Sequence, residues 1–261
     1  MIRFLLAIYL LSSVALAAEL TKLEVTNLHG IFTRTQVTNL SSFREKVTGL
    51  ISDKFTETTC TGTLIGPKQI ITAAHCVYNF EKKLWSEGLI FTPGKLSSDN
   101  IGAGAFGFKK IFIQKEYVES MDEEYDFAVV ELDTNIGDQV GWVGFRSLRS
   151  EENLEGKSRS ITFAGYPGDK EYGTLWRVTC PAAVKGKLFT YSCDSYGGMS
   201  GSALFQSSDS GNFIIGVHTF GGPEKNGGFF IDSRSFALID NWKNSSRYSK
   251  NTVIHLKKLE N

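Results

Sequence analysis

The chain has 261 residues, of which 41% are hydrophobic and 21% are charged, a composition typical of a globular protein with one large or two small cores. Its 28 basic and 28 acidic side chains balance, which argues against a general attraction to nucleic acid or anionic lipid. The sequence has no basic run, heptad pattern or obvious internal repeat, so coiled coils and repeat arrays are excluded as well.

The first 17 residues have the pattern of a secretory signal peptide. Arg3 gives a positive start, residues 4–11 form an apolar stretch, and Ala15-Leu16-Ala17 matches a small-residue cleavage site. An uncleaved membrane anchor is the alternative, but the apolar stretch is short for a span. We therefore expect residues 1–17 to be removed and the product to be secreted and extracellular, without membrane association. Residues 18–27 are interpreted as a pro-segment or arm.

From about Arg34 onward, short apolar runs alternate with Gly, Pro, Ser and Asp turns. This pattern predicts an all-β protein of the sandwich or barrel type. The polar stretch 147–160 indicates a connection between two halves. The expected strands are Leu64–Ile71 (two strands around a Gly-Pro turn), Ile111–Ile113, Phe127–Leu132, Ser160–Ala164, Thr174–Val178, Ser202–Phe205, Phe213–Val217 and Gly228–Ile231.

One helix is expected near the C-terminus. Ser233 or Ser235 could cap it, and it would carry Phe236, Ile239 and Trp242 on one face. We expect that face to pack on the second half of the chain. The polar segment from 251 to 261 has no assigned role.

Three segments carry the residue types that acyl transfer needs. Gly197-Gly198-Met199-Ser200-Gly201-Ser202 is a small-residue loop that can expose the Ser200 hydroxyl beside backbone N–H groups. His75 follows one predicted strand, and Asp126 opens another. A serine hydroxyl needs a base with a pKa near 7, and the histidine needs a carboxylate to fix its tautomer. Each residue alone is more often structural, but together they predict a catalytic triad in the order His, Asp, Ser, unlike subtilisins and α/β-hydrolases.

Four cysteines in a secreted chain suggest two disulfides, for which three pairings exist. We expect Cys60–Cys76, which would join the two sides of the histidine segment, and Cys180–Cys193, which would close a hairpin before the glycine-rich loop. A zinc site is the alternative because His75 lies next to Cys76. The spacing fits no common zinc pattern, so neither a metal nor another cofactor is expected.

The chain resembles the chymotrypsin-fold serine proteases and, more narrowly, the bacterial glutamyl endopeptidases. The match runs in order from about residue 34 to residue 245. Its markers are Arg34-Thr35-Gln36-Val37-Thr38-Asn39, Cys60-Thr61-Gly62, Gly66-Pro67-Lys68, Thr72-Ala73-Ala74-His75-Cys76, Tyr125-Asp126-Phe127-Ala128, Gly165-Tyr166-Pro167-Gly168-Asp169-Lys170, the Cys193–Ser202 loop, Gly216-Val217-His218-Thr219 and Asn241-Trp242-Lys243-Asn244. The resemblance implies two six-stranded antiparallel barrels with a C-terminal helix, forming one peptidase domain. Residues 28–146 would hold His75 and Asp126, and residues 147–261 would hold Ser200.

The resemblance also implies roles around the nucleophile. Gly198 and Ser200 would supply the N–H groups of the oxyanion hole, and Thr219-Phe220-Gly221 would pair with the substrate backbone by strand addition. His218, assisted by the Ser195 hydroxyl, would contact a substrate carboxylate. Two placed donors select a carboxylate over an apolar side chain, which predicts cleavage after Glu and less well after Asp. A buried structural role is the alternative for His218.

Three features qualify this specificity. Asp194 lies six residues before Ser200, where trypsin-like enzymes carry the aspartate that selects Lys or Arg, so that preference is an alternative. Met199 replaces the aspartate that pairs with a new amino terminus in the chymotrypsin branch, so that activation switch is absent. In the bacterial relatives the mature amino terminus, near Leu28 here, helps bind the acidic side chain. Such maturation would make the precursor a zymogen, although no clear processing signal stands at Leu28.

The sequence therefore predicts a secreted, monomeric serine endopeptidase that cleaves protein or peptide substrates through an acyl-enzyme. A catalytically silent binding module and an esterase on another fold are the alternatives. The complete triad argues against the first, and the lack of a Gly-X-Ser-X-Gly elbow after a strand argues against the second. Asn39 and Asn244 open Asn-X-Ser triplets that would accept glycans only in a eukaryotic source.

Overall fold

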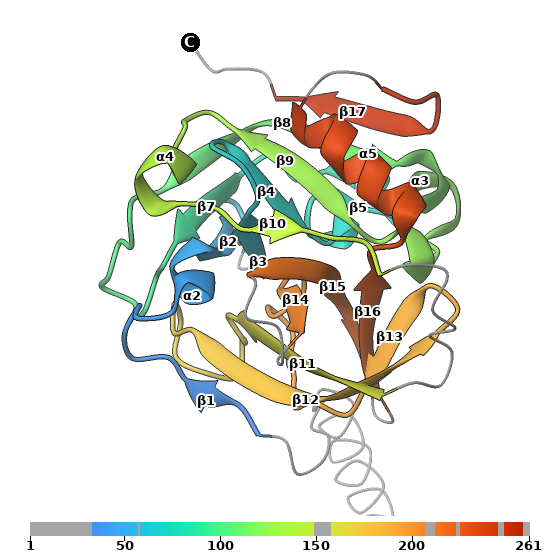
Figure 1. The fold of residues 1–261 in the computed structure, drawn as a ribbon. Helices are drawn as coiled ribbons and strands as arrows, with labels where there is room; N and C mark the ends of the chain where they lie inside the picture. The colour runs from blue at the N-terminus through green and yellow to red at the C-terminus, as the bar shows by residue number, and fades with distance from the viewer. Residues whose placement is uncertain are drawn as a thin grey trace, which may run out of the picture.

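The computed structural model describes residues 33–56, 58–148, 158–206, 212–222, 225–244 and 248–257. They form two antiparallel barrels that lie side by side (Figure 1). This confirms the expected chymotrypsin-like, all-β architecture with a C-terminal helix. The predicted signal peptide and arm, residues 1–27, lie outside the described residues. Along the described chain, no helix combines the length and apolar character needed to cross a membrane.

Each barrel is a closed ring of six strands. The first contains β2 (Thr48–Asp53), β3 (Thr59–Leu64), β4 (Gln69–Thr72), β7 (Leu89–Pro93), β8 (Phe106–Gln114) and β9 (Ala128–Leu132). The second contains β11 (Ser158–Gly165), β12 (Trp176–Lys185), β13 (Leu188–Tyr191), β14 (Ala203–Gln206), β15 (Phe213–Gly221) and β16 (Asn226–Phe230). The ring orders are β2-β3-β4-β9-β8-β7 and β11-β12-β13-β16-β15-β14. All eight predicted strand regions are thereby confirmed, with boundaries shifted by a few residues.

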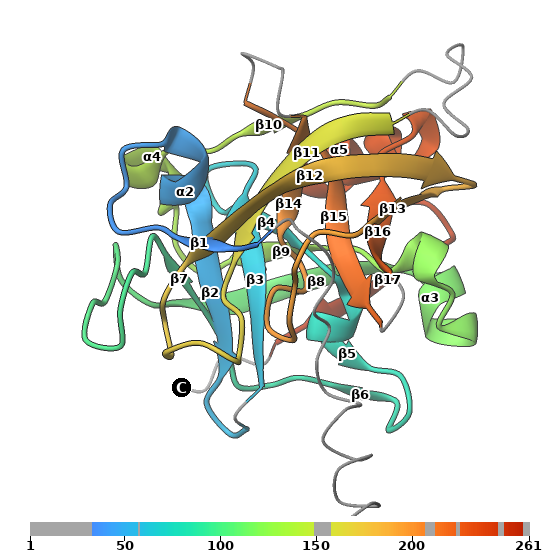
Figure 2. The same cartoon turned by 90° about the horizontal axis from the view of Figure 1, so that it is seen from below.

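Shorter elements connect and cover the barrels. They are β1 (Thr35–Gln36), α2 (Phe43–Val47), the 3-10 turn η1 (Ala74–Cys76), β5 (Tyr78–Asn79), β6 (Leu84–Trp85), α3 (Lys115–Ser120), the 3-10 turn η2 (Glu123–Tyr125), α4 (Gly137–Val140), β10 (Gly144–Phe145), α5 (Ser233–Asn244) and β17 (Thr252–Leu256). Two of the strands cross between the halves. The early strand β1 pairs with β12 of the second barrel, and the late strand β17 pairs with β8 of the first (Figures 1 and 2). The tail without an assigned role therefore contains a strand.

The burial pattern shows which faces of the strands are covered. In β12 the buried residues alternate with exposed ones, as expected for a strand with one face on a core. In β9 all five residues are buried. Its apolar outer face needs a cover, and α5 lies across it (Figure 1).

The position of α5 corrects one expectation. Its apolar face packs on the first barrel, not the second, because the outer face of β9 and the neighbouring aromatic rings are apolar. The Trp242 ring centroid lies 5.5 Å from that of Phe127 and 6.2 Å from that of Phe112. Neither predicted serine is the cap: the Asp232 carboxylate accepts a 2.7 Å hydrogen bond from the Ser235 N–H. The Asp232 backbone N–H in turn donates to the Ser235 hydroxyl at 2.9 Å and so completes a reciprocal capping pair.

Candidate active site

Two neighbouring strands of the first barrel bring His75 and Asp126 together. Thr72, the last residue of β4, pairs with Ala128, the first residue of β9. His75 lies three residues past the end of β4 and Asp126 lies two residues before the start of β9, so both reach the same end of the barrel. The His75 backbone N–H donates to Asp126 Oδ1 at 3.0 Å, and ring Nδ1 donates to Oδ2 at 2.7 Å. These two bonds fix the ring orientation and leave Nε2 free.

The titration of His75 follows from this contact. Burial disfavours the imidazolium, but the charge and the hydrogen bond of Asp126 favour it more strongly, so the pKa of His75 lies above its ordinary value. Asp126 itself is buried. The pair therefore has the orientation and the proton affinity of a general base that must hold a proton for part of a reaction.

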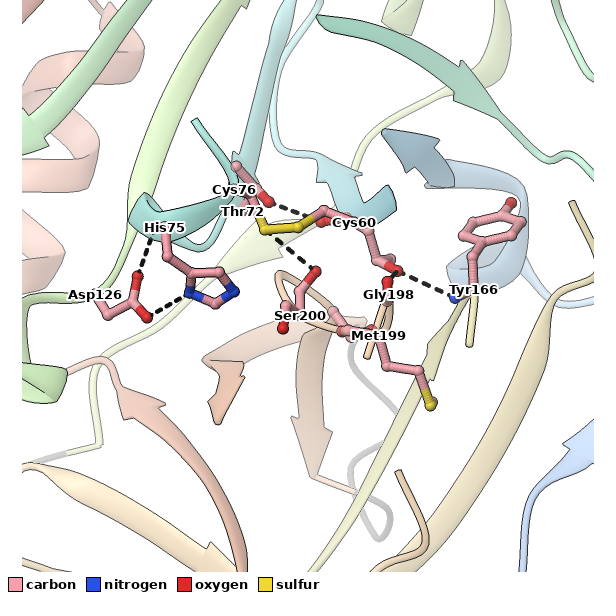
Figure 3. The surroundings of a disulfide bond; sticks show 11 residues. Cys60, Thr72, His75, Cys76, Asp126, Tyr166, Gly198, Met199 and Ser200 are labelled. Carbon is pink, nitrogen blue, oxygen red and sulfur yellow. Dashed lines mark hydrogen bonds and ion pairs between the residues drawn. A yellow bond between two sulfur atoms is a disulfide. The ribbon is translucent and has the colours of Figure 1, made fainter. Parts of the chain in front are cut away.

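The second barrel supplies Ser200 from the loop between β13 and β14. Figure 3 shows the His75 ring between Asp126 and Ser200. No hydrogen bond between Ser200 Oγ and His75 Nε2 is present in the described structure; such bonds are often long without substrate and tighten when it binds. The predicted triad residues are thus gathered from both barrels at one place.

The loop around Ser200 is held by a residue that the sequence analysis did not single out. Thr61 of β3 is fully buried. Its backbone N–H donates to the Ser200 carbonyl at 2.8 Å, and its hydroxyl donates to the Gly198 carbonyl at 2.9 Å. The first barrel thereby holds the carbonyls of the nucleophile loop. The only sequence signal for this role was the position of Thr61 next to Cys60.

With the carbonyls held, the N–H groups of Gly198 and Ser200 are left available. Within the described residues, no oxygen accepts a hydrogen bond from either N–H. Gly198 has a φ of +98°, and a Cβ there would collide with the Tyr166 carbonyl, so only glycine suits this position. Two free N–H groups, on residues separated by one position and beside a serine hydroxyl, have the arrangement of an oxyanion hole.

Two disulfides brace these segments. Cys60–Cys76 joins β3 to the turn that carries His75, and Cys180–Cys193 joins β12 to the loop that leads to Ser200. Cys60, Cys76 and His75 lie close enough to be considered as metal ligands. Both sulfurs are bonded to each other, however, so neither offers the thiolate that zinc needs, and these residues do not fit a metal.

Two cavities lie near the residues of the predicted site. One, of about 350 Å³, is lined by His75 and Asp126 and by Tyr117, Met121 and Phe220. The other, of about 580 Å³, lies between the loops that follow β2 and β11. Its lining includes Thr59, Tyr166 and Gly168, the residues that a Cβ on Gly198 would meet first. His75, Asp126 and Phe220 of the first cavity were predicted as functional residues, whereas Thr59, Tyr166 and Gly168 of the second were given no functional role.

His218 is buried on β15 in the second barrel. Its Nδ1 lies 2.6 Å from Tyr191 Oη and 3.0 Å from the Gly227 carbonyl, and its ring stacks on Phe163 with centroids 5.1 Å apart. Burial lowers the pKa of His218 to about 4, although the Gly227 carbonyl opposes this change, so the ring is neutral near pH 7.

The other residues predicted to bind substrate differ in burial and in the hydrogen-bonding groups that they leave free. The Ser195 hydroxyl is buried and has no hydrogen-bond partner in the described structure, which leaves it free for a ligand. Thr219 is buried, Phe220 is half-buried and Gly221 is exposed. The register of β15 with β14 ends at Val217, so among described strands the β14 side of residues 219–221 has no partner.

Asp194 is engaged by a distant residue. Arg34, which directly precedes β1, donates from Nε to Asp194 Oδ2 at 2.9 Å. Its two terminal nitrogens donate to the Asp169 carboxylate at 2.7 and 2.8 Å. The Arg34 side chain is only 2% exposed. In the sequence Arg34 was only one letter of a family marker, and nothing predicted its partners.

The chain was compared with known proteins. A family model named Trypsin matches residues 35–239. The extracellular metalloprotease of Bacillus subtilis is 34% identical over 236 residues, covering 88% of this chain and 74% of that protein. The glutamyl endopeptidase of Bacillus licheniformis is 34% identical over 223 residues, covering 82% of this chain and 68% of that protein.

Solved structures agree with this similarity. The structure of a Glu endopeptidase in complex with MPD has a TM-score of 0.73 at 30% identity, covering 83% of this chain and 99% of that one. The protease Anisep from Arthrobacter nicotinovorans has a TM-score of 0.64 at 18% identity, covering 82% and 99%, and supports the fold alone. The name of the Bacillus subtilis relative includes the word metalloprotease. Among the described residues the one cluster of possible metal ligands is Cys60, His75 and Cys76, and its two sulfurs are joined in a disulfide.

Proposed function

Because the chain belongs to the trypsin family of chymotrypsin-fold serine endopeptidases, we propose that it is a secreted enzyme that cleaves proteins or peptides after Glu and less well after Asp. The observation that carries the catalytic part is the doubly bonded His75–Asp126 pair beside Ser200, whose loop keeps two N–H groups free. We further propose that residues 28–146 and 147–261 form one peptidase domain, since the triad needs both barrels.

The chemistry follows from the positions of these groups. Ser200 Oγ attacks the substrate carbonyl carbon while His75 Nε2 takes the hydroxyl proton, and the negative charge on the carbonyl oxygen is stabilised by the N–H groups of Gly198 and Ser200. Asp126 stabilises the imidazolium without taking the proton. The C–N bond then breaks as His75 gives the proton to the leaving amine. Water, activated by His75, hydrolyses the acyl-enzyme and restores the Ser200 hydroxyl.

Two features support cleavage within a chain. An endopeptidase must accommodate residues on both sides of the cleaved bond. One cavity is lined by His75 and Asp126, and the other by Thr59, Tyr166 and Gly168, which lie around Gly198. The free side of residues 219–221 offers backbone groups with which an extended peptide can pair, as in β-strand addition. Thr219, Phe220 and Gly221 are therefore assigned to substrate binding.

Acidic specificity is supported by the state of His218. A neutral imidazole can donate from Nε2 only when Nδ1 accepts. This tautomer requires the Tyr191 hydroxyl, 2.6 Å from Nδ1, to donate to Nδ1 and not to the Gly227 carbonyl, which lies 3.0 Å from both atoms. In this tautomer Nε2–H and the unpartnered Ser195 hydroxyl are two donors for a substrate carboxylate. A pocket built to hydrogen-bond a group strongly rejects side chains that lack it.

The alternative preference for Lys or Arg depends on Asp194. A trypsin-like pocket needs a carboxylate that is free to meet the substrate cation. Here Asp194 Oδ2 is already bound by Arg34. This contact favours acidic over basic specificity.

Secretion, maturation and assembly belong to the same proposal. The two disulfides fit an oxidising compartment, as does the signal-peptide pattern of residues 1–17. We propose that the enzyme is made as a zymogen, is secreted and acts as a monomer. N-terminal sequencing of the protein from the culture medium tests maturation, and sedimentation at several concentrations tests the monomer.

Two experiments test the activity. Wild-type enzyme should be labelled by an organophosphonate probe, and Ser200→Ala should not be labelled. Labelling that persists in Ser200→Ala refutes the nucleophile, whereas no labelling of the wild type favours a silent binding module. Digestion of a mixed peptide library should give cuts mainly after Glu, and cuts mainly after Lys or Arg would refute the acidic preference.

A further inference from the structure

One buried cation joins three segments that are far apart in the chain. Arg34 precedes β1, Asp169 lies in the loop after β11, and Asp194 lies in the loop that leads to the nucleophile. The Arg34 guanidinium binds Asp169 through two nitrogens and Asp194 through the third. Bidentate and charge-assisted bonds of this kind are the strong ones in proteins.

Asp194 depends on this single contact. It is 8% exposed, and Arg34 is its only ion-pair partner among the described residues. Its other oxygen, Oδ1, is buried without any hydrogen-bond partner in the described structure. A buried carboxylate that loses its cation must either keep an uncompensated charge or take up a proton. The charge state next to Ser195 is therefore set by Arg34.

Asp169 is placed differently. Its side chain is 23% exposed and has a second cation nearby, Lys170 Nζ at 3.6 Å. Burial raises the pKa of Asp169, but the contacts with Arg34 and Lys170 outweigh this and lower it below its ordinary value. Asp169 thus keeps partial compensation without Arg34, whereas Asp194 does not.

We propose that Arg34 is a positioning residue for substrate selection, which binds Asp194 and so removes its negative charge from the specificity pocket. Asp194 is adjacent in sequence to Ser195, the hydroxyl assigned to the substrate carboxylate. An unpaired Asp194 would repel a Glu side chain and attract a Lys or Arg side chain. The inference rests on the proposed acidic specificity and adds the residue that makes an aspartate compatible with it.

The ion pair also connects the pocket to the first strand of the described chain. Thr35 and Gln36 of β1 pair with β12, and the Val37 N–H donates to the Leu175 carbonyl at 2.8 Å. Arg34 is thus held by its own backbone neighbours as well as by the two carboxylates. The competing explanation is a purely structural role, in which Arg34 only anchors this segment to the second barrel. An experiment must distinguish this role from substrate selection.

The experiment compares Arg34→Met, Asp194→Asn, the double variant and the control Asp169→Asn. For each, kcat/KM is measured on matched peptides with Glu, Gln or Lys before the cleaved bond, and active sites are titrated with an organophosphonate. Arg34→Met should lower kcat/KM for the Glu peptide roughly 10- to 100-fold, lower that for Gln much less, and raise the Lys-to-Glu ratio. The double variant should regain the Glu preference, because the unpaired charge is gone. Asp169→Asn should keep it.

The outcomes are distinct. Failure of the double variant to regain Glu preference overturns the inference and favours the structural role, as does an equal loss for all three peptides in Arg34→Met. Arg34→Gln should show the same loss of Glu preference as Arg34→Met and replaces it in the comparison if Arg34→Met does not fold. A wild type without Glu preference refutes the proposed function itself. A wild type that prefers Glu, with unchanged selectivity in both Arg34 variants, overturns only the role of Arg34.

Discussion

His75 and His218 lie on different barrels, and the same side chain meets opposite surroundings. His75 is at the cleft with two hydrogen bonds to a carboxylate, which raises its pKa. His218 is 2% exposed, has no carboxylate partner among the described residues, and its pKa is lowered to about 4. Burial lowers the pKa of both rings, although the His75 side chain is 33% exposed, and the difference between them is the ionised partner of His75. One ring is equipped to gain and lose a proton, and the other to donate a hydrogen bond while it stays neutral.

The largest effect is expected from removing the charge that distinguishes His75. Asp126→Asn should lower kcat/KM roughly 10⁴-fold, because an amide stabilises the wrong tautomer and cannot stabilise the imidazolium. Steady-state kinetics on a Glu peptide measure this. The matched control is His218→Gln, which should keep most of its organophosphonate labelling. A loss below 100-fold in Asp126→Asn would contradict the assigned role.

The second effect concerns stability and has opposite signs for the two histidines. His218 binds a proton in the unfolded chain below pH 6.5 but in the folded chain only below about pH 4. Its contribution to the free energy of unfolding is therefore present above pH 6.5 and falls by about 3 kcal/mol on acidification to about pH 4. His75, with its raised pKa, contributes stability below pH 6.5 that is lost as the pH rises through its folded value.

Denaturant unfolding of the inactive Ser200→Ala protein between pH 4 and pH 7 measures these contributions without self-digestion. Adding His218→Phe should flatten the pH dependence in this window by most of the 3 kcal/mol expected from the pKa of about 4. If the pH dependence of the free energy of unfolding does not change, His218 has the same pKa in the folded and the unfolded chain. The contrast between the two rings would then fail.

A smaller effect is expected on selectivity. His218→Ala should lower kcat/KM for a Glu peptide about 10- to 100-fold relative to a Gln peptide, the range of one lost hydrogen bond to a charged group. Labelling by the organophosphonate should be retained, because the triad is untouched. Loss of labelling together with selectivity would instead assign His218 a structural role.

The smallest effect is expected on the midpoint of the pH dependence of kcat/KM. His75 must be neutral to accept the Ser200 proton, so kcat/KM should rise with pH through its pKa, with a midpoint above pH 6.5 because that pKa is raised. His218→Ala should leave this midpoint unchanged, since His218 is neutral throughout that range. A midpoint that moves by a full pH unit in this variant would show that the two rings titrate together.

The parts of this site that could be predicted are those that local sequence determines. Strand positions follow from short apolar runs, and His75, Asp126 and Ser200 stand at strand ends or in a glycine-rich loop, where their residue types are informative. The order of the three in the chain then points to a two-barrel fold. The disulfide pairing was one of three, and the structure contains the expected pair.

The rest depends on which distant segments meet. Arg34 and Asp194 are 160 residues apart, and neither has a local pattern that names the other. Trp242 and Ile239 lie on the expected helical face, but the sequence cannot state which barrel has the larger uncovered apolar surface. The apolar run Phe127-Ala128-Val129-Val130 that leads through β9 was the one available signal, because a strand buried on both faces needs a covering layer.

The crossed terminal strands have a consequence for biosynthesis. The part of β8 that pairs with β17 has its partner only after residues 252–256 have been synthesised, and β1 has its partner only after β12 is made. During translation the sheet of the first barrel therefore lacks β17 until the end of the chain is made. Arg34 likewise has neither carboxylate partner until Asp169 and Asp194 have been synthesised. A ribosome-bound fragment that ends before Ser200 lacks both the nucleophile and the strand that covers β8. The proposed triad is therefore complete only after Ser200 of the second barrel has been synthesised.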